Sequence, residues 1–159
     1  MQFGFSYVGL VYLLMLMVPN IIWSRCRPEG YDGFAAGEDR RLLILERIGE
    51  AAVSVTVLIF SDFNIRTDSP WSIWLAASFA AMVLYELYWL RYFRSGRTME
   101  DMYGPFLGIP VAGASLPVAA FALLAVYGLN PILGIAVLVL GIGHIGIHLN
   151  HLRELGGAR

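Results

Sequence analysis

The chain has 159 residues, of which 58% are hydrophobic and only 14% are charged. A soluble domain of this size needs more polar surface, so we expect a multi-pass protein of the cell membrane, with the lipid bilayer as its main partner. The net charge of −1 comes from scattered residues without a basic stripe, so we expect no nucleic-acid partner. The single cysteine, Cys26, excludes an intramolecular disulfide and a thiolate metal cluster within one chain.

Five apolar segments are each close to the roughly 20 residues that one bilayer crossing requires. They leave no room for a separate soluble domain, so we predict an all-α, polytopic membrane helical bundle that forms a single domain over residues 1–159. The first segment lacks a preceding positive region and a following small-residue cleavage site, which favours a retained helix over a signal peptide. The predicted transmembrane helices cover residues 3–23, 42–60, 71–90, 106–127 and 131–149.

The arginines alternate between the connections of these segments. Four lie in the first connection, one in the second, three in the third, none in the fourth and two after the last helix. The positive-inside rule therefore predicts that the first and third connections and the C-terminus are cytoplasmic and that the N-terminus is outside.

Local signals indicate where some elements begin. Asn130 followed by Pro131 is typical of an N-cap and a proline at the first helical position, and a Gly-Pro pair at 104–105 is predicted to open the fourth helix. Thr98 and Asp101 have capping-box spacing and predict one short turn. The first connection, rich in glycine, is predicted to be an irregular loop.

Acidic and imidazole side chains gather in the cytoplasmic halves of the second, third and fifth segments. With the cytoplasmic arginines as a ruler and a rise of about 1.5 Å per residue, Glu46, Glu86 and His148 share one depth, and Glu50 and His144 share a deeper one. A spacing of four residues places both histidines, and likewise Glu46 and Glu50, on one face of their helix. Because a charge at a helix centre costs about 2.5 to 3.5 kcal/mol, the coincidence predicts a shared site.

Further polar residues lie near this predicted site. Arg47 would fix an anionic head group or one carboxylate, Tyr85 and Tyr88 would hydrogen-bond the acids, and Asn20 lies near the same level. We assign substrate binding to these four residues. The acid/base group is predicted to comprise Glu46, Glu50, Glu86 and His144.

A purely structural role for these charges is the alternative. Arg47 and Glu50, at helical spacing, could neutralise each other, and Glu86 could pair with Arg91 or Arg47, so that the charges only orient the helices. His151, close to the interface, is predicted to be a solvated cation at the helix end.

Two kinds of chemistry fit these residue types. Imidazole and carboxylate groups bind divalent metals such as zinc or iron, and the metal ligands would be His144, His148, Glu50 and Glu86. Without a metal, the same groups could shuttle protons. Bis-histidine haem is not expected in a monomer, because the histidines lie on one helix.

The His144-x-x-x-His148 spacing resembles that of membrane hydrolases of the ceramidase and adiponectin-receptor group. The resemblance covers two residues only. The seven-helix architecture and the upstream histidine of that group are missing here, so the resemblance implies no activity and assigns no family.

The fourth helix is predicted to carry two prolines, Pro110 and Pro117, which free backbone carbonyls. Its small residues, and the glycines of the fifth helix, would let these two helices approach closely. Such a kinked helix could also open a lateral portal for a lipid-like substrate.

These observations favour a small membrane-embedded enzyme or binding protein that acts on an apolar or lipid-like molecule from the inner leaflet. One alternative is a proton- or cation-coupled transporter that works as a homo-oligomer. Another is a non-catalytic subunit of a larger membrane complex. The polar groups lie on one side only, which favours the first interpretation.

Overall fold

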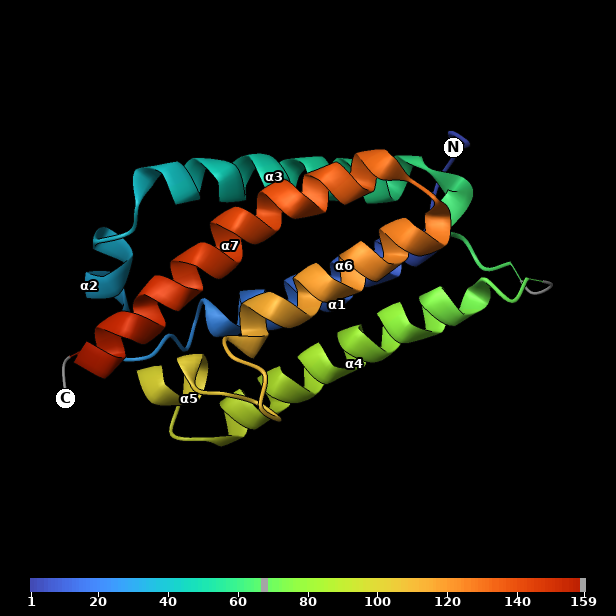
Figure 1. Cartoon of the computed structure of the whole chain (residues 1–159). Helices are drawn as coiled ribbons and strands as arrows, with labels where there is room; N and C mark the ends of the chain where they lie inside the picture. The colour runs from blue at the N-terminus through green and yellow to red at the C-terminus, as the bar shows by residue number, and fades with distance from the viewer. Residues whose placement is uncertain (67–68, 158–159) are drawn as a thin grey trace.

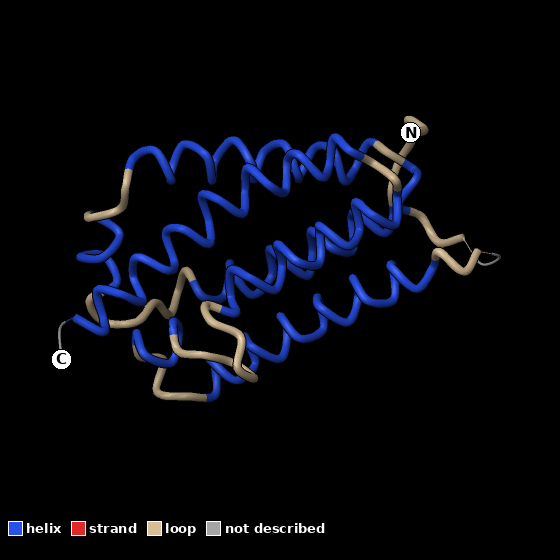
Figure 2. Tube along the Cα trace, in the orientation of Figure 1, coloured by secondary structure: helices blue, strands red, loops and turns tan. Residues whose placement is uncertain are grey.

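The computed structural model describes residues 1–66 and 69–157. It is all-α: the structure is 77% helical, and its described residues form no strand (Figure 2). This confirms the predicted fold class at the level of an all-α bundle. The described part of the chain contains five long helices, α1 (Tyr7–Trp23), α3 (Arg40–Ile59), α4 (Ser72–Arg94), α6 (Ala112–Gly128) and α7 (Pro131–Gly157).

The helices run back and forth, so that the connections gather at two ends (Figure 1). Segments 24–39 and 95–111 lie at the same end as the C-terminal end of α7, and the N-terminus and residues 60–66 lie at the other. Helices α3 and α7 form the most extensive pair, followed by α4 with α6. The arginine-rich connections therefore share one end of the bundle.

Helix α1 begins later than predicted because residues 2–6 are extended and bind the end of α3. The Gly4 amide donates to the Ile59 carbonyl at 2.9 Å, and the Ser6 amide donates to the Leu58 carbonyl at 3.0 Å. The Ser6 side chain then accepts from the Gly9 amide at 2.9 Å and caps α1. The N-terminal segment thus satisfies carbonyl groups that the last turn of α3 leaves open.

The predicted start of the fourth helix is wrong. Helix α6 begins at Ala112, six residues later than expected, because Phe106 and Ile109 exchange two backbone hydrogen bonds in a tight turn. Leu107 and Val111 have φ angles of 52° and 42°, which interrupt any helix here. Pro110 consequently precedes the helix, and the expected pair of prolines within one helix does not form.

Two short helices cover the arginine-rich end. Helix α2 (Tyr31–Ala36) lies in the first connection, which corrects the prediction of an irregular loop. Helix α5 (Met99–Tyr103) confirms the predicted short turn, and Thr98 and Asp101 form the capping box. A 3-10 turn, η1 (Ser61–Phe63), follows α3 at the other end. The Asn130 side chain accepts from the Leu133 amide at 3.0 Å, which confirms the cap before α7.

Glycines bring α3 and α7 together. A Cβ atom at Gly49 would lie 2.6 Å from the Cβ of Leu140, and one at Gly143 would lie 2.7 Å from the Leu42 carbonyl oxygen. Contacts this short do not occur in folded proteins, so only glycine permits the approach. The small residues of the predicted fourth and fifth helices, α6 and α7, were expected to let those two helices approach closely. The closest backbone contacts of the glycines are instead between α3 and α7.

The outer surface carries many large apolar side chains, and extended exposed apolar surface is typical of sites that contact a membrane or another protein. Two helices, α4 with its preceding turn (Pro70–Arg94) and α7, are long and apolar enough to cross a membrane, and α1 and α6 are apolar but shorter. Exposed apolar residues include Leu10, Leu14, Met17 and Ile21 on α1, Ile44, Ile48 and Val55 on α3, Ile73, Phe79 and Leu87 on α4, and Ile132, Ile135, Leu138 and Ile142 on α7.

Candidate functional site

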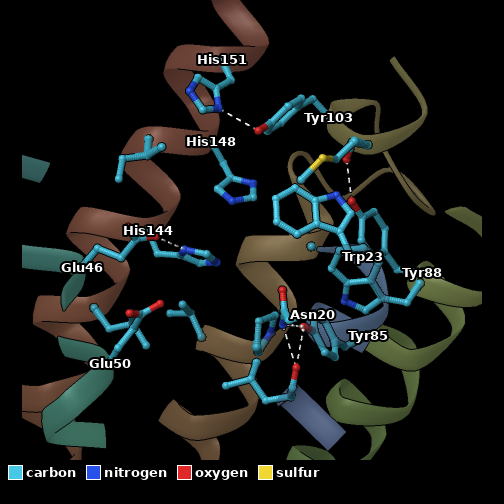
Figure 3. Close-up of a pocket in the computed structure, with 18 of the residues that line it drawn as sticks. Asn20, Trp23, Glu46, Glu50, Tyr85, Tyr88, Tyr103, His144, His148 and His151 are labelled. Carbon is cyan, nitrogen blue, oxygen red and sulfur yellow. Dashed lines mark hydrogen bonds and ion pairs between the residues drawn. The ribbon is translucent and has the colours of Figure 1, made fainter. Parts of the chain in front are cut away.

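A cavity of about 330 Å³ lies inside the arginine-rich end of the bundle. Its volume falls at the lower end of the range of small-molecule sites. One wall is polar, and the opposite wall is aromatic (Figure 3). The polar wall comprises Glu38, Glu46, Arg47, Glu50, His144, His148 and His151, and the aromatic wall comprises Trp23, Tyr31, Tyr85, Tyr88, Trp89, Tyr103 and Phe121.

Glu46 of α3 and His144 of α7 form the central contact of the polar wall. His144 Nδ1 lies 2.6 Å from Glu46 Oε1, and the two side chains are 24% and 11% exposed. The contact depends on Gly143, because a Cβ atom there would lie 2.8 Å from the Cα of Glu46. The prediction that an acid of the second long helix meets an imidazole of the last therefore holds, although the expected partner of His144 was Glu50.

The shift in partner follows from how α3 and α7 are offset along their axes. Gly143 packs directly against the backbone of Glu46, where a Cβ atom would lie 2.8 Å from the Glu46 Cα, so the next residue, His144, lies beside Glu46 and not beside the acid one turn further along α3.

Glu50 instead pairs with Arg47 on its own helix. Arg47 Nη1 donates to Glu50 Oε2 at 3.0 Å, and the side chains are 72% and 44% exposed. An exposed pair of this kind contributes little to stability. This is the contact expected if Arg47 and Glu50 neutralise each other on one helix. Both residues still line the cavity at its exposed edge.

His148 is positioned between the other two histidines and has free ring nitrogens. Its ring centroid lies 4.6 Å from that of His144 and 5.3 Å from that of Tyr103. It makes no hydrogen bond to any residue that the structure describes. Because it lines the cavity, its nitrogens are available to a bound molecule.

His151 is not the solvated cation predicted from its position near the helix end. Its side chain is 2% exposed, and Nδ1 lies 2.7 Å from the Tyr103 hydroxyl. Helix α2 also covers it, with the Phe34 ring centroid at 5.7 Å. Burial raises the pKa of Tyr103, so the phenol keeps its proton and can donate to Nδ1. His151 Nε2 then faces Glu38 Oε1 at 3.5 Å.

Glu38 and His151 lie on the boundary between two cavities. Together with Ile147 they line both the inner cavity and an outer depression of about 240 Å³. The outer depression also contacts Asn150 and Arg153. Burial, followed by the charge of Glu46, raises the pKa of Glu38 above its ordinary value. This boundary therefore contains a carboxyl group that binds its proton more tightly than a solvated one.

The raised pKa of Glu38 predicts a pH-dependent stability. The folded protein binds this proton more tightly than the unfolded chain, so stability falls as pH rises from the ordinary carboxyl range through the raised pKa. We expect Glu38→Gln to melt at a higher temperature than wild type near about pH 8, with the difference disappearing near about pH 4. Melting curves across pH measure this. Glu29→Gln, an exposed residue of the same connection, is the control; an advantage of Glu38→Gln that is the same at every pH would contradict the prediction.

The polar atoms of the aromatic wall form hydrogen bonds to other groups of the protein. The Tyr88 hydroxyl donates to the Met102 carbonyl at 2.6 Å, and Asn20 Nδ2 donates to the Tyr85 hydroxyl at 2.8 Å and to the Leu16 carbonyl at 2.7 Å. The expected hydrogen bonds from Tyr85 and Tyr88 to the acids are therefore not made. All three side chains nevertheless line the cavity.

Glu86 lies outside the cavity. It is absent from the lining residues, and its Oε1 atom is buried without a hydrogen-bond partner among the described residues. The suggested partner Arg91 instead donates to the Asp101 carbonyl at 2.6 Å. The structure does not bring Glu86 to Glu46, His144 or His148.

The predicted metal ligands are not arranged around one point. Across residues 1–66 and 69–157, no group of three or more His, Cys, Asp or Glu side chains is placed to hold a metal ion. Of the four proposed ligands, His144 contacts Glu46, Glu50 contacts Arg47, and Glu86 lies apart. The geometry therefore supports hydrogen bonding and proton transfer better than metal binding.

Several lining residues could not be identified from their positions in the sequence. Tyr31 and Glu38 belong to the first connection, where Tyr31 begins α2 and Glu38 follows it, and Trp23 is the last residue of α1. Tyr103 had an indirect signal, because the capping box of Thr98 predicts the short helix that carries it. No protein-family model, curated protein or solved structure matches this chain.

Proposed function

We propose that the chain is a multi-pass membrane protein whose cavity opens toward the cytoplasmic side. The exposed apolar side chains on α1, α3, α4 and α7 support lipid contact. The arginine-rich connections lie at the cavity end of the bundle, and the positive-inside rule assigns that end to the cytoplasm (Figure 1). The cavity would then lie within the inner leaflet.

Within this setting, the proposed function is to bind a small, largely apolar molecule and to exchange a proton with it. One observation carries the proposal: a single cavity joins an aromatic wall to the Glu46–His144 pair. The carboxylate orients the imidazole through Nδ1, which leaves Nε2 for a ligand. A histidine held in this way is suited to general acid/base chemistry.

The exposed edge of the cavity lies between α1 and α3. The two helices touch at the far end, where a Cβ atom at Gly9 would lie 2.8 Å from the carbonyl carbon of Val57. Toward the cavity they diverge (Figure 1), and the lining there includes the exposed residues Asn20 and Arg47 and the half-buried Glu50. An apolar molecule dissolved in the bilayer would enter sideways through this gap.

The core of the other half of the bundle is closely packed, although an apolar groove of about 560 Å³ runs between α6 and α7. Tyr12 donates to Ser78 at 2.9 Å, Ser78 donates to the Ala120 carbonyl at 2.7 Å, and Leu124 is fully buried. This packing favours a site reached from one side over a path through the protein.

Photolabelling tests whether the cavity takes an apolar molecule. Irradiation with trifluoromethyl-phenyl-diazirine, a small apolar probe, is expected to label Met102, which lines the cavity on α5, as well as the exposed apolar residues. Leu16→Phe fills the cavity and should remove the label at Met102 while leaving the exposed positions labelled. Leu14→Phe is the same change at a residue of α1 that is 52% exposed, and it should leave the labels at Met102 and at the exposed positions unchanged. Labelling of the wild type at exposed positions alone would refute the proposal.

A further inference from the structure

We propose that the molecule bound in this cavity carries a protonated amine, an inference that rests on the binding function proposed above. The inference is based on the polar wall, with its three carboxyl groups, which faces the aromatic wall across one cavity (Figure 3). Glu38, Glu46 and Glu50 line the cavity, and Arg47 is the single arginine among the lining residues.

The one arginine is not available to an anion. Arg47 is 72% exposed and already donates to Glu50 Oε2 at 3.0 Å. Its charge is therefore matched by Glu50. The partners of the other two acids are histidine rings, with His144 Nδ1 at 2.6 Å from Glu46 and His151 Nε2 at 3.5 Å from Glu38. An anionic head group entering the cavity would find no free arginine among the lining residues, and the Glu46 carboxylate would repel it.

Glu46 offers a free acceptor at the centre of the site. Oε1 contacts His144, but Oε2 makes no hydrogen bond to any residue that the structure describes. Its side chain is 11% exposed, so a charge-assisted hydrogen bond there would be shielded from bulk water. An ammonium group can donate to this oxygen and to the unpartnered nitrogen of a neutral His148.

The opposite wall suits a cation with an apolar body. Aromatic ring faces attract cations, and rings of this wall already do so: the guanidinium of Arg27 lies 5.6 Å from the Trp23 ring centroid, and that of Arg91 lies 5.3 Å from the Tyr88 ring centroid. Trp89 adds another ring to the cavity lining. An aliphatic or aryl-alkyl amine would therefore find carboxylates for its head and rings for its body.

Competition among three molecules with one skeleton tests the inference. Phenylbutylamine, phenylbutanol and phenylbutyrate share an aryl-alkyl body and present a cation, a neutral hydroxyl or an anion. Each is titrated against diazirine labelling of Met102 in the full-length protein. The amine is expected to compete at a concentration at least about tenfold lower than the alcohol, and the carboxylate to compete worst.

Matched variants assign the preference to the acids. Glu46→Gln should bring the amine and the alcohol within about threefold of each other, and Glu50→Gln at the exposed edge should reduce the difference in part. Glu86→Gln, a carboxyl outside the cavity, should retain the full preference, and melting curves establish that each variant is folded.

The outcomes separate the two proposals. If the alcohol competes as well as the amine, or if the preference survives in both Glu46→Gln and Glu50→Gln, the amine inference is overturned and apolar binding stands. If Met102 is not labelled in the wild type, both proposals fall together.

Discussion

Substitution of Gly143 by alanine is expected to destabilise the protein by about 3 kcal/mol, because the interface of α3 and α7 has no space for a side chain there. The added Cβ would lie 2.7 Å from the Leu42 carbonyl oxygen and 2.8 Å from the Cα of Glu46. These are backbone atoms of a helix, so relief requires moving α3 as a whole. Unfolding curves in mixed detergent measure the change in free energy.

Gly134 provides the control on the same helix. A Cβ atom at Gly134 would have no neighbour within 4 Å, so Gly134→Ala should be neutral or stabilise α7 by up to about 1 kcal/mol. In Gly143→Ala, by contrast, the displacement of α3 should also separate Glu46 from His144. Equal stability of the two alanine variants would show that α3 and α7 are not packed as described.

Removal of the Glu46 carboxyl should produce the second large effect. Glu46→Ala leaves the partly buried His144 without the partner that lies 2.6 Å from Nδ1, and should cost about 2 kcal/mol. Glu46→Gln keeps a hydrogen-bonding group of similar shape and should cost less. Thermal or detergent-induced unfolding measures the stability of the wild type, Glu46→Gln and Glu46→Ala, which should decrease in that order.

The same variants should change the protonation pattern of His144. In the wild type, the carboxylate stabilises a proton on Nδ1, so nitrogen NMR of labelled histidine should report a protonated Nδ1. Glu46→Gln should shift the population toward the other tautomer, because an amide can also donate to Nδ1. Glu86→Gln should leave the His144 signals unchanged. A His144 spectrum that does not respond to Glu46→Gln would mean that the pair does not act as a unit.

The long helices could be predicted because length and apolar composition are local properties of the sequence. The cap at Asn130 and the capping box of Thr98 are also local, and both were predicted. The start of α6 was missed because the apolar run continues through the turn. Gly108, whose φ angle is 80°, and Pro110 are typical turn residues, but the positive φ angles of Leu107 and Val111 have no counterpart in their residue types. Hydrophobicity alone did not distinguish that turn from a helix.

The site was predicted in part for a related reason. Four-residue spacing correctly placed Glu46 and Glu50 on one face of α3, and His144 and His148 on one face of α7. Which acid meets which imidazole depends on how the two helices are offset, and the close packing at Gly143 sets that offset. Contributions from α2 and α5 depend on tertiary packing and have no periodic signal, so the burial of His151 could not be anticipated.

The place of Glu38 on the boundary of two cavities also couples it electrostatically to Glu46. Electrostatic energies vary inversely with the effective dielectric constant, which differs severalfold between bulk water and a dry interior. The charge of Glu46 contributes to the raised pKa of Glu38, and the coupling is reciprocal, so protonation of Glu38 lowers the electrostatic energy of a charge on Glu46. A residue of the first connection, outside the five long helices, therefore influences the centre of the site without any movement of α3 or α7.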